Sequence, residues 1–247
     1  MKSVVVIPAR YASTRFPGKP LVKLLGKPMI LWVAELCAKA VGQASVYVAT
    51  EDERIANTVR EAGFRAVMTS TTALTGTDRI AEAARQIDAE IFINVQGDEP
   101  LLNPNDILEI IGKKEAYPDE IINGYCPLAA EEDPYNINIP KVVFTGDHRL
   151  LYISRLPVPG YKNTGKKPEA YYKQVCIYAF TRDELQQYHH YGRKSRLEDS
   201  EDIEILRFFE WGATVRMVET SPGSLAIDVK EDIPMVEKHL RAMQRKA

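Results

Sequence analysis

The stretch VVVIPARYASTRFPGKPL, residues 4–21, decides the fold. Its first residues, 4–7, form an unbroken apolar run, which is typical of a strand buried on both faces of a parallel sheet. The loop that follows carries Arg10, Arg15 and Lys19 among prolines and a glycine. Cations at the carboxyl end of such a strand favour a polyphosphate ligand, and a solvated basic turn is the alternative. The loop matches neither the Walker A nor the GxGxxG pattern.

The composition is that of a globular chain with nearly balanced charge. It has 247 residues, of which 45% are hydrophobic, enough for a large core. The formal net charge of -2 argues against a nucleic-acid partner held by bulk charge. Three scattered cysteines fit reduced thiols, not a disulfide framework. Because no apolar run reaches the length of a membrane span and no signal-peptide pattern is present, we expect a cytoplasmic protein without membrane contact.

Strand and helix patterns alternate along the chain, which is typical of an α/β fold with a doubly wound sheet. Apolar runs predict strands at 4–7, 45–49, 64–68, 91–95, 124–129, 141–144, 150–153, 173–180 and 214–218. Helical spacing predicts helices at 29–40, 55–62, 107–114, 183–188, 198–210 and 233–243. We expect one domain over 1–247, with a lobe inserted at the edge of the sheet at about 131–170.

A further helix start is expected within 74–87, where Thr77 or Asp78 can cap the first turn and Gly76 lies in the turn ahead. Backbone amides exposed at a helix start suit an anion or a nucleotide base, and Arg79 lies beside them. Helix capping alone explains the pattern about equally well.

Two aspartates follow apolar runs in distant parts of the chain. Asp98 comes directly after the predicted strand 91–95 and beside Gly97, and Asp228 ends the short run 224–228. A carboxylate at the carboxyl end of a central strand is a natural ligand for a hard cation. We therefore predict Asp98 as a metal ligand, with an ordinary turn aspartate as the alternative.

Several blocks resemble the 3-deoxy-manno-octulosonate (Kdo) cytidylyltransferases, also called CMP-Kdo synthetases, in the same order over nearly the whole chain. The blocks are PARYASTRFPGKP, ATEDERI, TGTDR, NVQGDEP, LYISR and the late Asp228. The resemblance implies a Rossmann-like, mixed and mostly parallel sheet with a dimerisation lobe, and therefore a homodimer. It also implies the reaction of CTP with Kdo, which yields CMP-Kdo and pyrophosphate for lipopolysaccharide biosynthesis, with Mg²⁺ as cofactor.

The resemblance also implies roles for individual residues. Lys19, Arg15, Asp98 and Asp228 would be catalytic, and the two aspartates would hold Mg²⁺. The implied nucleotide contacts are Arg10, Arg15, Lys19, Thr75, Gly76 and Arg79. The implied sugar contacts are Gln96, Arg155, Gln174, Tyr178, Glu204 and Ile205.

The sequence departs from the family pattern in three places. Thr72, Ala73 and Thr75 stand where an aspartate-histidine pair and a serine are common, which concerns base recognition. Gln174 replaces a histidine and Ile205 replaces a glutamine, and both positions face the sugar in the family.

The changes on the sugar side make 8-amino-3,8-dideoxy-Kdo the leading rival substrate. The segment 198–204 carries five acidic residues, and an acidic pocket would favour an ammonium group on the sugar. A solvated, acidic helix start is the alternative reading of that segment. Transfer from another nucleotide such as UTP, and a catalytically silent relative, are the other functions considered.

Overall fold

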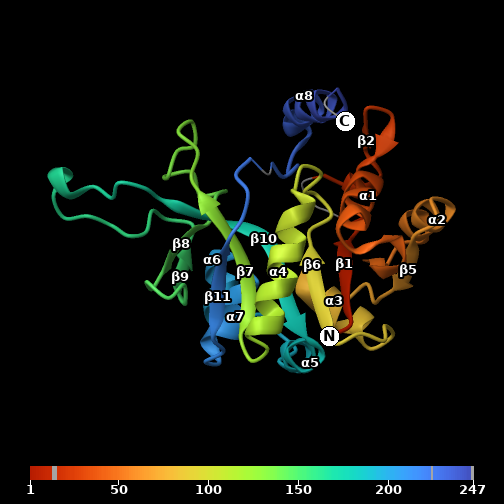
Figure 1. The fold of residues 1–247 in the computed structure, drawn as a ribbon, viewed down its shortest axis with the longest axis horizontal. Coiled ribbons are helices and arrows are strands. Elements are labelled where there is room, and N and C mark those ends of the chain that lie inside the picture. Colours follow the sequence, from red (N-terminus) through yellow and green to blue (C-terminus); the bar gives the residue numbers. More distant parts are fainter. Residues whose placement is uncertain (13–15, 224, 246–247) are drawn as a thin grey trace.

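The computed structural model describes residues 1–12, 16–223 and 225–245, so the predicted phosphate contact Arg15 lies outside the described residues. A nine-stranded sheet forms the centre of the described chain (Figure 1). Its strands are β1 (Ser3–Ala9), β4 (Val46–Thr50), β5 (Arg65–Met68), β6 (Ile91–Val95), β7 (Ile121–Pro127), β8 (Lys141–Phe144), β9 (Leu150–Ser154), β10 (Tyr172–Thr181) and β11 (Val215–Glu219). A separate small sheet pairs β2 (Lys23–Leu24) with β3 (Lys27–Pro28).

Eight α-helices and four 3₁₀ helices occur in the described residues. The α-helices are α1 (Met29–Val41), α2 (Glu53–Glu61), α3 (Gly76–Ala84), α4 (Pro104–Ala116), α5 (Arg182–His190), α6 (Arg196–Glu201), α7 (Ile205–Glu210) and α8 (Ile233–Gln244). The 3₁₀ helices are η1 (Lys19–Leu21), η2 (Gln43–Ser45), η3 (Thr164–Lys166) and η4 (Lys230–Asp232).

The sheet is mixed and mostly parallel, which confirms the predicted fold class. The strand order is β11-β7-β10-β6-β1-β4-β5, and β1 runs parallel to both of its neighbours. β10 is antiparallel to β6 and β7. Because β1 and β6 are parallel neighbours, the loops that leave their carboxyl ends reach the same edge of the sheet.

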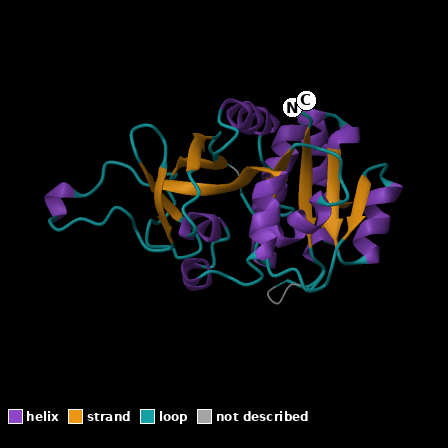
Figure 2. Ribbon diagram, turned by 90° about the horizontal axis from the view of Figure 1, so that it is seen from below, coloured by secondary structure: helices purple, strands orange, loops and turns teal. Residues whose placement is uncertain are grey.

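Helices cover both faces of this sheet, as Figure 2 shows for its parallel half. On one face, α1, α2 and α4 pack apolar side chains against residues such as Val5 and Ile93. On the other face, α3, α5 and α7 pack against residues such as Val6 and Phe92. Adjacent residues of one strand thus face opposite cores, which explains why β1 and β6 read as continuous apolar runs.

Two helix predictions differ from the structure. The cap of α3 is Thr75 rather than Thr77 or Asp78, so Gly76 is the first helical residue. The single helix expected at 198–210 is divided into α6 and α7, because Asp202 between them has left-handed backbone torsions (φ 49°). An Asp in that conformation is tolerated and ends a helix.

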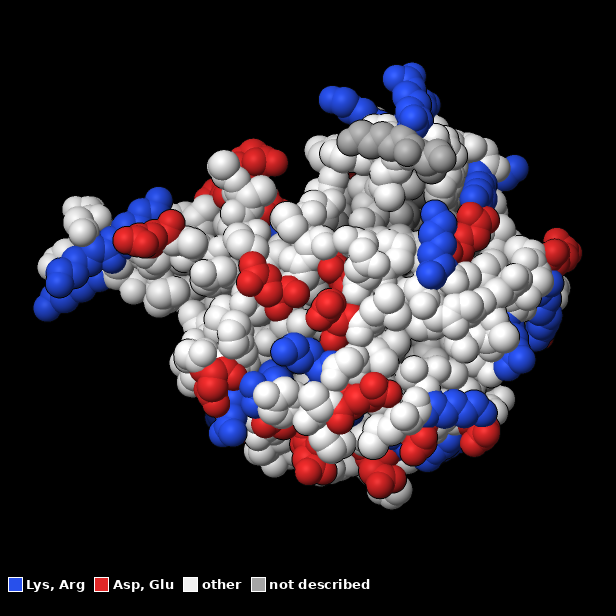
Figure 3. Space-filling model, in the orientation of Figure 1, with Lys and Arg blue, Asp and Glu red and all other residues white. Residues whose placement is uncertain are grey.

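Residues 128–171, between β7 and β10, form an arm that projects from the body of the molecule. The β8–β9 hairpin and a long loop that bears η3 at its tip extend away from the parallel strands (Figures 1 and 2). Acidic and basic side chains are interspersed on the face drawn in Figure 3, and basic side chains lie at the outer end of this arm. Within the described ranges, no helix is both long and apolar enough to cross a bilayer.

A third, smaller hydrophobic cluster joins the two ends of the chain. Phe16, Leu24 and Met29 from the amino-terminal part pack with Ile227 and with Val236 of α8. Leu25 packs against this cluster, and its backbone N–H donates a hydrogen bond to Oε1 of Glu237 at 2.9 Å. This packing holds the segment before α8 over the end of the sheet where the two strand loops meet.

Candidate active site

A pocket of about 390 Å³ opens at the carboxyl ends of β1 and β6. The start of α3, the middle of β10 and the segment before η4 form its other walls. The predicted site residues that line it are Arg10, Lys19, Thr75, Gly76, Arg79, Gln96, Asp98, Arg155, Gln174, Tyr178, Glu204 and Asp228. The fold therefore gathers residues from all parts of the chain at the edge where open α/β sheets bind ligands.

Two glycines allow the loops to meet at this edge. A Cβ on Gly97 would lie 3.0 Å from the carbonyl oxygen of Pro8, so a side chain there would crowd the end of β1. Gly18 has a positive φ of 70°, and its N–H donates to the carbonyl of Tyr11 at 2.9 Å. This turn closes the loop and presents Lys19 to the pocket.

Lys19 lies between the two predicted metal ligands. Its Nζ is 2.5 Å from Oδ2 of Asp98 and 3.8 Å from Oδ1 of Asp228. It also donates a hydrogen bond to the carbonyl oxygen of Ile227 at 2.9 Å. The N–H of Ile227 donates to the carbonyl oxygen of Asp98 at 3.0 Å, which ties the late segment to the loop after β6. The juxtaposition expected from the sequence is therefore present.

The chemistry of these oxygens suits Mg²⁺. This ion prefers oxygen ligands, retains several waters and commonly binds through one or two carboxylates together with substrate phosphates. Asp98 and Asp228 already place a cationic group between them. Among the described residues, no group of three or more His, Cys, Asp or Glu side chains is arranged to hold a metal. Further ligands would have to come from water and phosphate, so the magnesium assignment remains a proposal.

Glu51, after β4, holds two parts of the predicted nucleotide site in place. Its Oε1 accepts a hydrogen bond from the N–H of Tyr11 at 2.8 Å, and its Oε2 is 2.9 Å from Nη1 of Arg79. Arg79 is only 4% exposed and also donates to the hydroxyl of Thr69 at 2.6 Å. Burial lowers the pKa of Arg79 and the nearby Glu51 charge opposes that shift. Arg79 is thus fixed internally, whereas Arg10 is exposed at the pocket.

The amino end of α3 already holds a carboxylate of the chain. The N–H groups of Gly76 and Thr77 donate to Glu204 at 3.0 and 2.8 Å, and the Thr77 hydroxyl donates at 2.5 Å. Burial raises the pKa of Glu204, and these donors act to lower it. Negative charge is favourable at a helix amino end. The amides that were predicted to bind a ligand therefore bind the carboxylate of Glu204.

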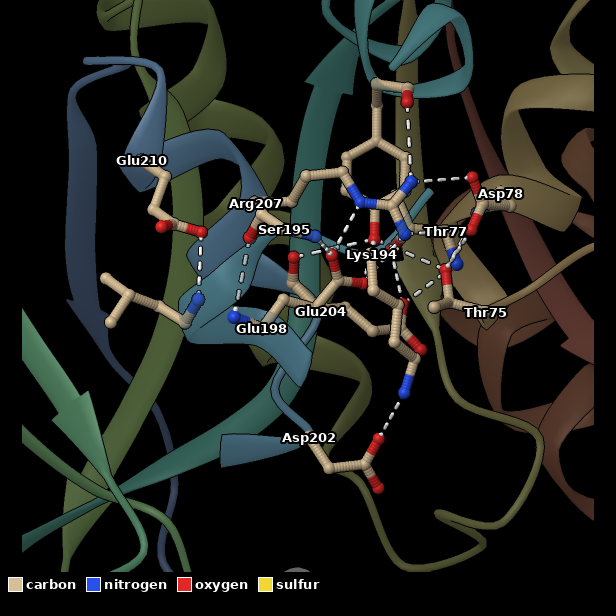
Figure 4. A network of polar contacts seen from close by, with 12 residues as sticks. Thr75, Thr77, Asp78, Lys194, Ser195, Glu198, Asp202, Glu204, Arg207 and Glu210 are labelled. Atoms are coloured by element: carbon tan, nitrogen blue, oxygen red, sulfur yellow. Dashed lines mark hydrogen bonds and ion pairs between the residues drawn. The ribbon is translucent and has the colours of Figure 1, made fainter. Parts of the chain in front are cut away.

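A buried ion cluster centred on Arg207 lies behind this helix start (Figure 4). Arg207 donates to both oxygens of Asp78 at 2.8 and 3.1 Å and to both oxygens of Glu198 at 2.7 Å. Its guanidinium carbon is 3.7 Å from the ring centre of Tyr188. Burial acts to lower the pKa of Arg207, but the hydrogen bonds to Glu198 and Asp78 raise it overall. The cluster fixes α3 relative to α6 and α7.

Three neutral polar side chains cover the part of the pocket next to β10. Gln174 donates from Nε2 to Oδ1 of Asn123 at 2.9 Å. Burial raises the pKa of Tyr178 well above its usual value, so its hydroxyl stays neutral. Gln96 lies against the start of α3, since a Cβ on Gly76 would be 3.2 Å from its Nε2. Such groups suit the hydroxyls of a sugar.

Arg155, predicted to meet the carboxylate of the sugar, lines the pocket but also joins the arm to the body. It donates to the carbonyl oxygens of Ile137, Glu201 and Asp202. These contacts use three of the five N–H donors of a guanidinium. A substrate carboxylate would therefore meet an arginine whose orientation is already set.

Ile205 does not line the pocket, contrary to expectation. It is 1% exposed and lies with Leu206 and Phe208 in the hydrophobic cluster under the sheet. The reason is the break at Asp202, which starts α7 anew and turns this first residue towards the core.

Three of the five carboxylates in the acidic segment around α6 line the pocket, those of Glu198, Asp202 and Glu204. Asp199 lines a separate depression, and Glu201 accepts a hydrogen bond from the N–H of Arg155 at 2.8 Å. Asp202 lines the pocket but lies 2.7 Å from Nζ of Lys194. Neither the fully acidic pocket nor the fully solvated helix start describes this segment, because most of its charges have partners within the fold.

Lys194 lines the pocket and was missed by the sequence analysis, whereas Glu198, which also lines it, entered only as one of the five acidic residues of 198–204. A local signal existed, since Ser195 and Glu198 form a capping box that begins α6 directly after Lys194. The pairing of Asp78 with Arg207 had no such signal, because those residues are 129 positions apart.

Comparison with known proteins agrees with this geometry. Residues 4–240 match the cytidylyltransferase family model. A 3-deoxy-manno-octulosonate cytidylyltransferase of Geobacter metallireducens is 42% identical, over 99% of this chain and 100% of the relative. An 8-amino-3,8-dideoxy-manno-octulosonate cytidylyltransferase of Shewanella oneidensis is 40% identical, over 97% of this chain and 99% of the relative.

Solved structures show the same relation. A CMP:2-keto-3-deoxy-manno-octonic acid synthetase in complex with CTP superposes with a TM-score of 0.90 at 35% identity, over 98% of this chain and 100% of that chain. A cytidylyltransferase of Leptospira borgpetersenii has a TM-score of 0.65 at 16% identity, over 98% and 87% of the two chains, and shares the fold. The chain therefore belongs to the cytidylyltransferase family, among the relatives named for Kdo and 8-amino-Kdo.

Proposed function

We propose that this protein transfers a cytidylyl group from CTP to Kdo and releases pyrophosphate. The observation that carries the proposal is the meeting of Lys19, Asp98 and Asp228 in a pocket at the carboxyl ends of β1 and β6. Relatives at about 40% identity are named for this reaction and for its 8-amino variant. We place the activity in the cytoplasm, as a step that supplies lipopolysaccharide biosynthesis.

The reaction requires positioning and charge neutralisation more than covalent chemistry by the protein. The anomeric oxygen of the sugar forms a bond to the α-phosphorus, the bond from that phosphorus to the bridging oxygen breaks, and the hydroxyl proton is released. Arg10 and Lys19 line the pocket as cations that can contact the triphosphate, and we assign Arg15 to the same task from its place in the loop. Thr75, Gly76 and Arg79 form the wall where the nucleoside would lie.

Asp98 and Asp228 are the residues that would hold Mg²⁺ in this pocket. When bound, the ion would supply positive charge to phosphate oxygens. The carboxylates come from two segments joined by the hydrogen bond between Ile227 and Asp98, so their spacing is set by the fold.

The sugar would lie along Gln96, Gln174, Tyr178 and Arg155. The fixed guanidinium of Arg155 suits the carboxylate of an ulosonic acid. Buried neutral groups on β10 suit hydroxyls, because a hydroxyl can both donate and accept.

A second candidate substrate is 8-amino-3,8-dideoxy-Kdo. The uncharged Gln174 and the pocket carboxylates of Asp202 and Glu204 favour an ammonium group more than a cationic histidine at position 174 would. The ratio of kcat/KM for the two sugars decides between them. A preference for Kdo by the wild-type protein rejects the amino sugar, and Gln174→His should shift the ratio further towards Kdo.

We also propose a homodimer formed through the arm. Four large apolar side chains on the arm and hairpin are more than half exposed: Tyr135, Ile137, Leu151 and Leu156. A contiguous exposed apolar patch marks an interaction surface, and we infer that these four side chains contribute to one. Light scattering at micromolar concentration should give the mass of two chains, and the mass of one chain would reject the dimer.

The proposed reaction is tested by measuring pyrophosphate release with four nucleoside triphosphates crossed against several ulosonic acids. We expect release only when CTP and a Kdo-type acid are both present with Mg²⁺. Equal rates with UTP would contradict the nucleotide assignment. Absence of release in every combination, from a folded protein, would favour a silent relative.

A further inference from the structure

The cation between Asp98 and Asp228 is part of the chain itself. The ammonium of Lys19 contacts Oδ2 of Asp98 and the carbonyl oxygen of Ile227, and it lies within ion-pair distance of Asp228. These are hard oxygen atoms, the type that a divalent ion would use. The lysine therefore occupies the space that the proposed metal would enter.

This placement is built into the fold. Lys19 is the first residue of η1, which follows the left-handed turn at Gly18, and Pro20 beside it is buried. The side chain of Lys19 is 17% exposed, and that of Asp98 is 24% exposed. The backbone of Lys19 is thus fixed next to the two aspartates, and its flexible side chain carries the ammonium to them.

An ammonium and a divalent ion cannot both contact the same carboxylate oxygen without strong repulsion. A free metal ion would have to displace Lys19 and leave its ammonium without those oxygens. A bound triphosphate changes the balance in two ways, because it offers the ammonium other anionic oxygens and it supplies further ligands to the metal.

We propose that Lys19 is an internal counter-cation that keeps the metal site closed to free divalent ions until the nucleotide binds. The metal then enters together with the triphosphate, and Lys19 moves from the carboxylates to the phosphates. This inference rests on the proposed function and adds an order of binding to it.

The test measures Mn²⁺ binding in the absence of nucleotide, by the electron paramagnetic resonance signal of the free ion. We expect weak binding by the wild-type protein. Lys19→Met keeps the length of the side chain without its charge and should raise the affinity about ten- to a hundredfold, the range of a hydrogen bond to a charged group. Lys23→Met is the matched control, since Lys23 is exposed and close in sequence.

The gain must come from this pair of carboxylates, so Asp98→Asn added to Lys19→Met should abolish it. Lys19→Gln is a second neutral variant that should behave like Lys19→Met, and thermal melting checks that each variant folds. The proposal is overturned if Lys19→Met binds Mn²⁺ within twofold of the wild type, or if the wild type binds as tightly as the variant should.

This measurement needs no turnover and no sugar. Failure of the proposed reaction, with the Mn²⁺ result as expected, would leave the counter-cation in place and reject only the substrates. Normal CMP-sugar synthesis by the wild-type protein, together with Mn²⁺ binding by Lys19→Met that is unchanged from the wild type, would reject the counter-cation alone.

Discussion

Both ends of the pocket contain a charged group of the chain in a position where a ligand is expected, but the two groups are held differently. At one end, the Lys19 ammonium lies between Asp98 and Asp228. At the other end, the Glu204 carboxylate lies on the amino end of α3 and accepts three hydrogen bonds. Lys19 reaches these oxygens through one flexible side chain. Glu204 is bound by the start of α3, and the buried cluster around Arg207 fixes α3 relative to α6 and α7.

The difference separates groups that can respond to a ligand from groups that shape the pocket. Lys19 and Asp98 are partly exposed and can change partners when phosphate arrives. Arg207 is fully buried, and its partners Asp78 and Glu198 are nearly so. Removing charge at the first end should therefore change catalysis with the fold intact, and removing charge at the second end should change stability.

The largest effect is expected from Arg207→Met, which leaves Asp78 and Glu198 buried without their cation. Breaking a buried ion pair in this way costs about 3–5 kcal/mol of unfolding free energy. Urea denaturation measures the change. The control is Arg196→Met, because Arg196 is 89% exposed and its partner is 3.9 Å away. A loss below about 1 kcal/mol, the value of a surface pair, would show that the cluster does not fix α3 relative to α6 and α7.

The next effect is expected from Asp98→Asn and Asp228→Asn. Each change removes a charge proposed to hold Mg²⁺, so turnover should fall by about 10²–10³-fold, as for loss of a group that stabilises transition-state charge. Melting temperatures should change little, because both side chains lie at the pocket surface. Near-normal pyrophosphate release by both variants would remove the metal assignment.

A smaller effect is expected from Lys19→Ala. If the lysine reaches phosphate charge that develops during transfer, kcat should fall by roughly ten- to a hundredfold while KM for CTP changes less. Steady-state kinetics with varied CTP separates the two constants. A rise in KM with kcat intact would make Lys19 a binding residue only.

The smallest effect concerns pH. Burial raises the pKa of Glu204, so near and above the ordinary glutamate value the folded protein holds this proton more firmly than the unfolded chain does. The sign follows from linkage: the contribution of Glu204 to stability falls as pH rises from the unfolded pKa, near 4.5, through the raised folded pKa. The unfolding free energy of the wild type minus that of Glu204→Gln should therefore decrease over that window. An increase would show that the ionised form of Glu204 stabilises the fold.

The same contrast explains how far the sequence could predict this protein. β1 and β6, and the residues that follow them, were predicted because a strand buried on both faces is a continuous apolar run and its carboxyl end marks the site. The meeting of Asp98 and Asp228 was implied by the family resemblance and not by a strand pattern, because residues 225–228 do not form a strand. Motifs were informative wherever function depends on a local loop.

The sugar end was predicted less well for a physical reason. The acidic residues near α6 were visible, but some of their partners come from distant segments, such as Arg155 for Glu201 and Thr77 for Glu204. The burial of Ile205 depends on the left-handed backbone at Asp202, and no neighbouring glycine signals that break. Net charge in a segment does not give the charge of a pocket when the fold supplies the opposite sign.

The central claim is that the pocket joins CMP to an ulosonic acid. The most direct test is phosphorus NMR of wild-type protein with CTP, Kdo and Mg²⁺. The account predicts that pyrophosphate and the phosphodiester of a CMP-sugar appear in equal amounts as CTP disappears. Orthophosphate, or pyrophosphate accompanied by free CMP from the start, would show hydrolysis instead and would contradict it.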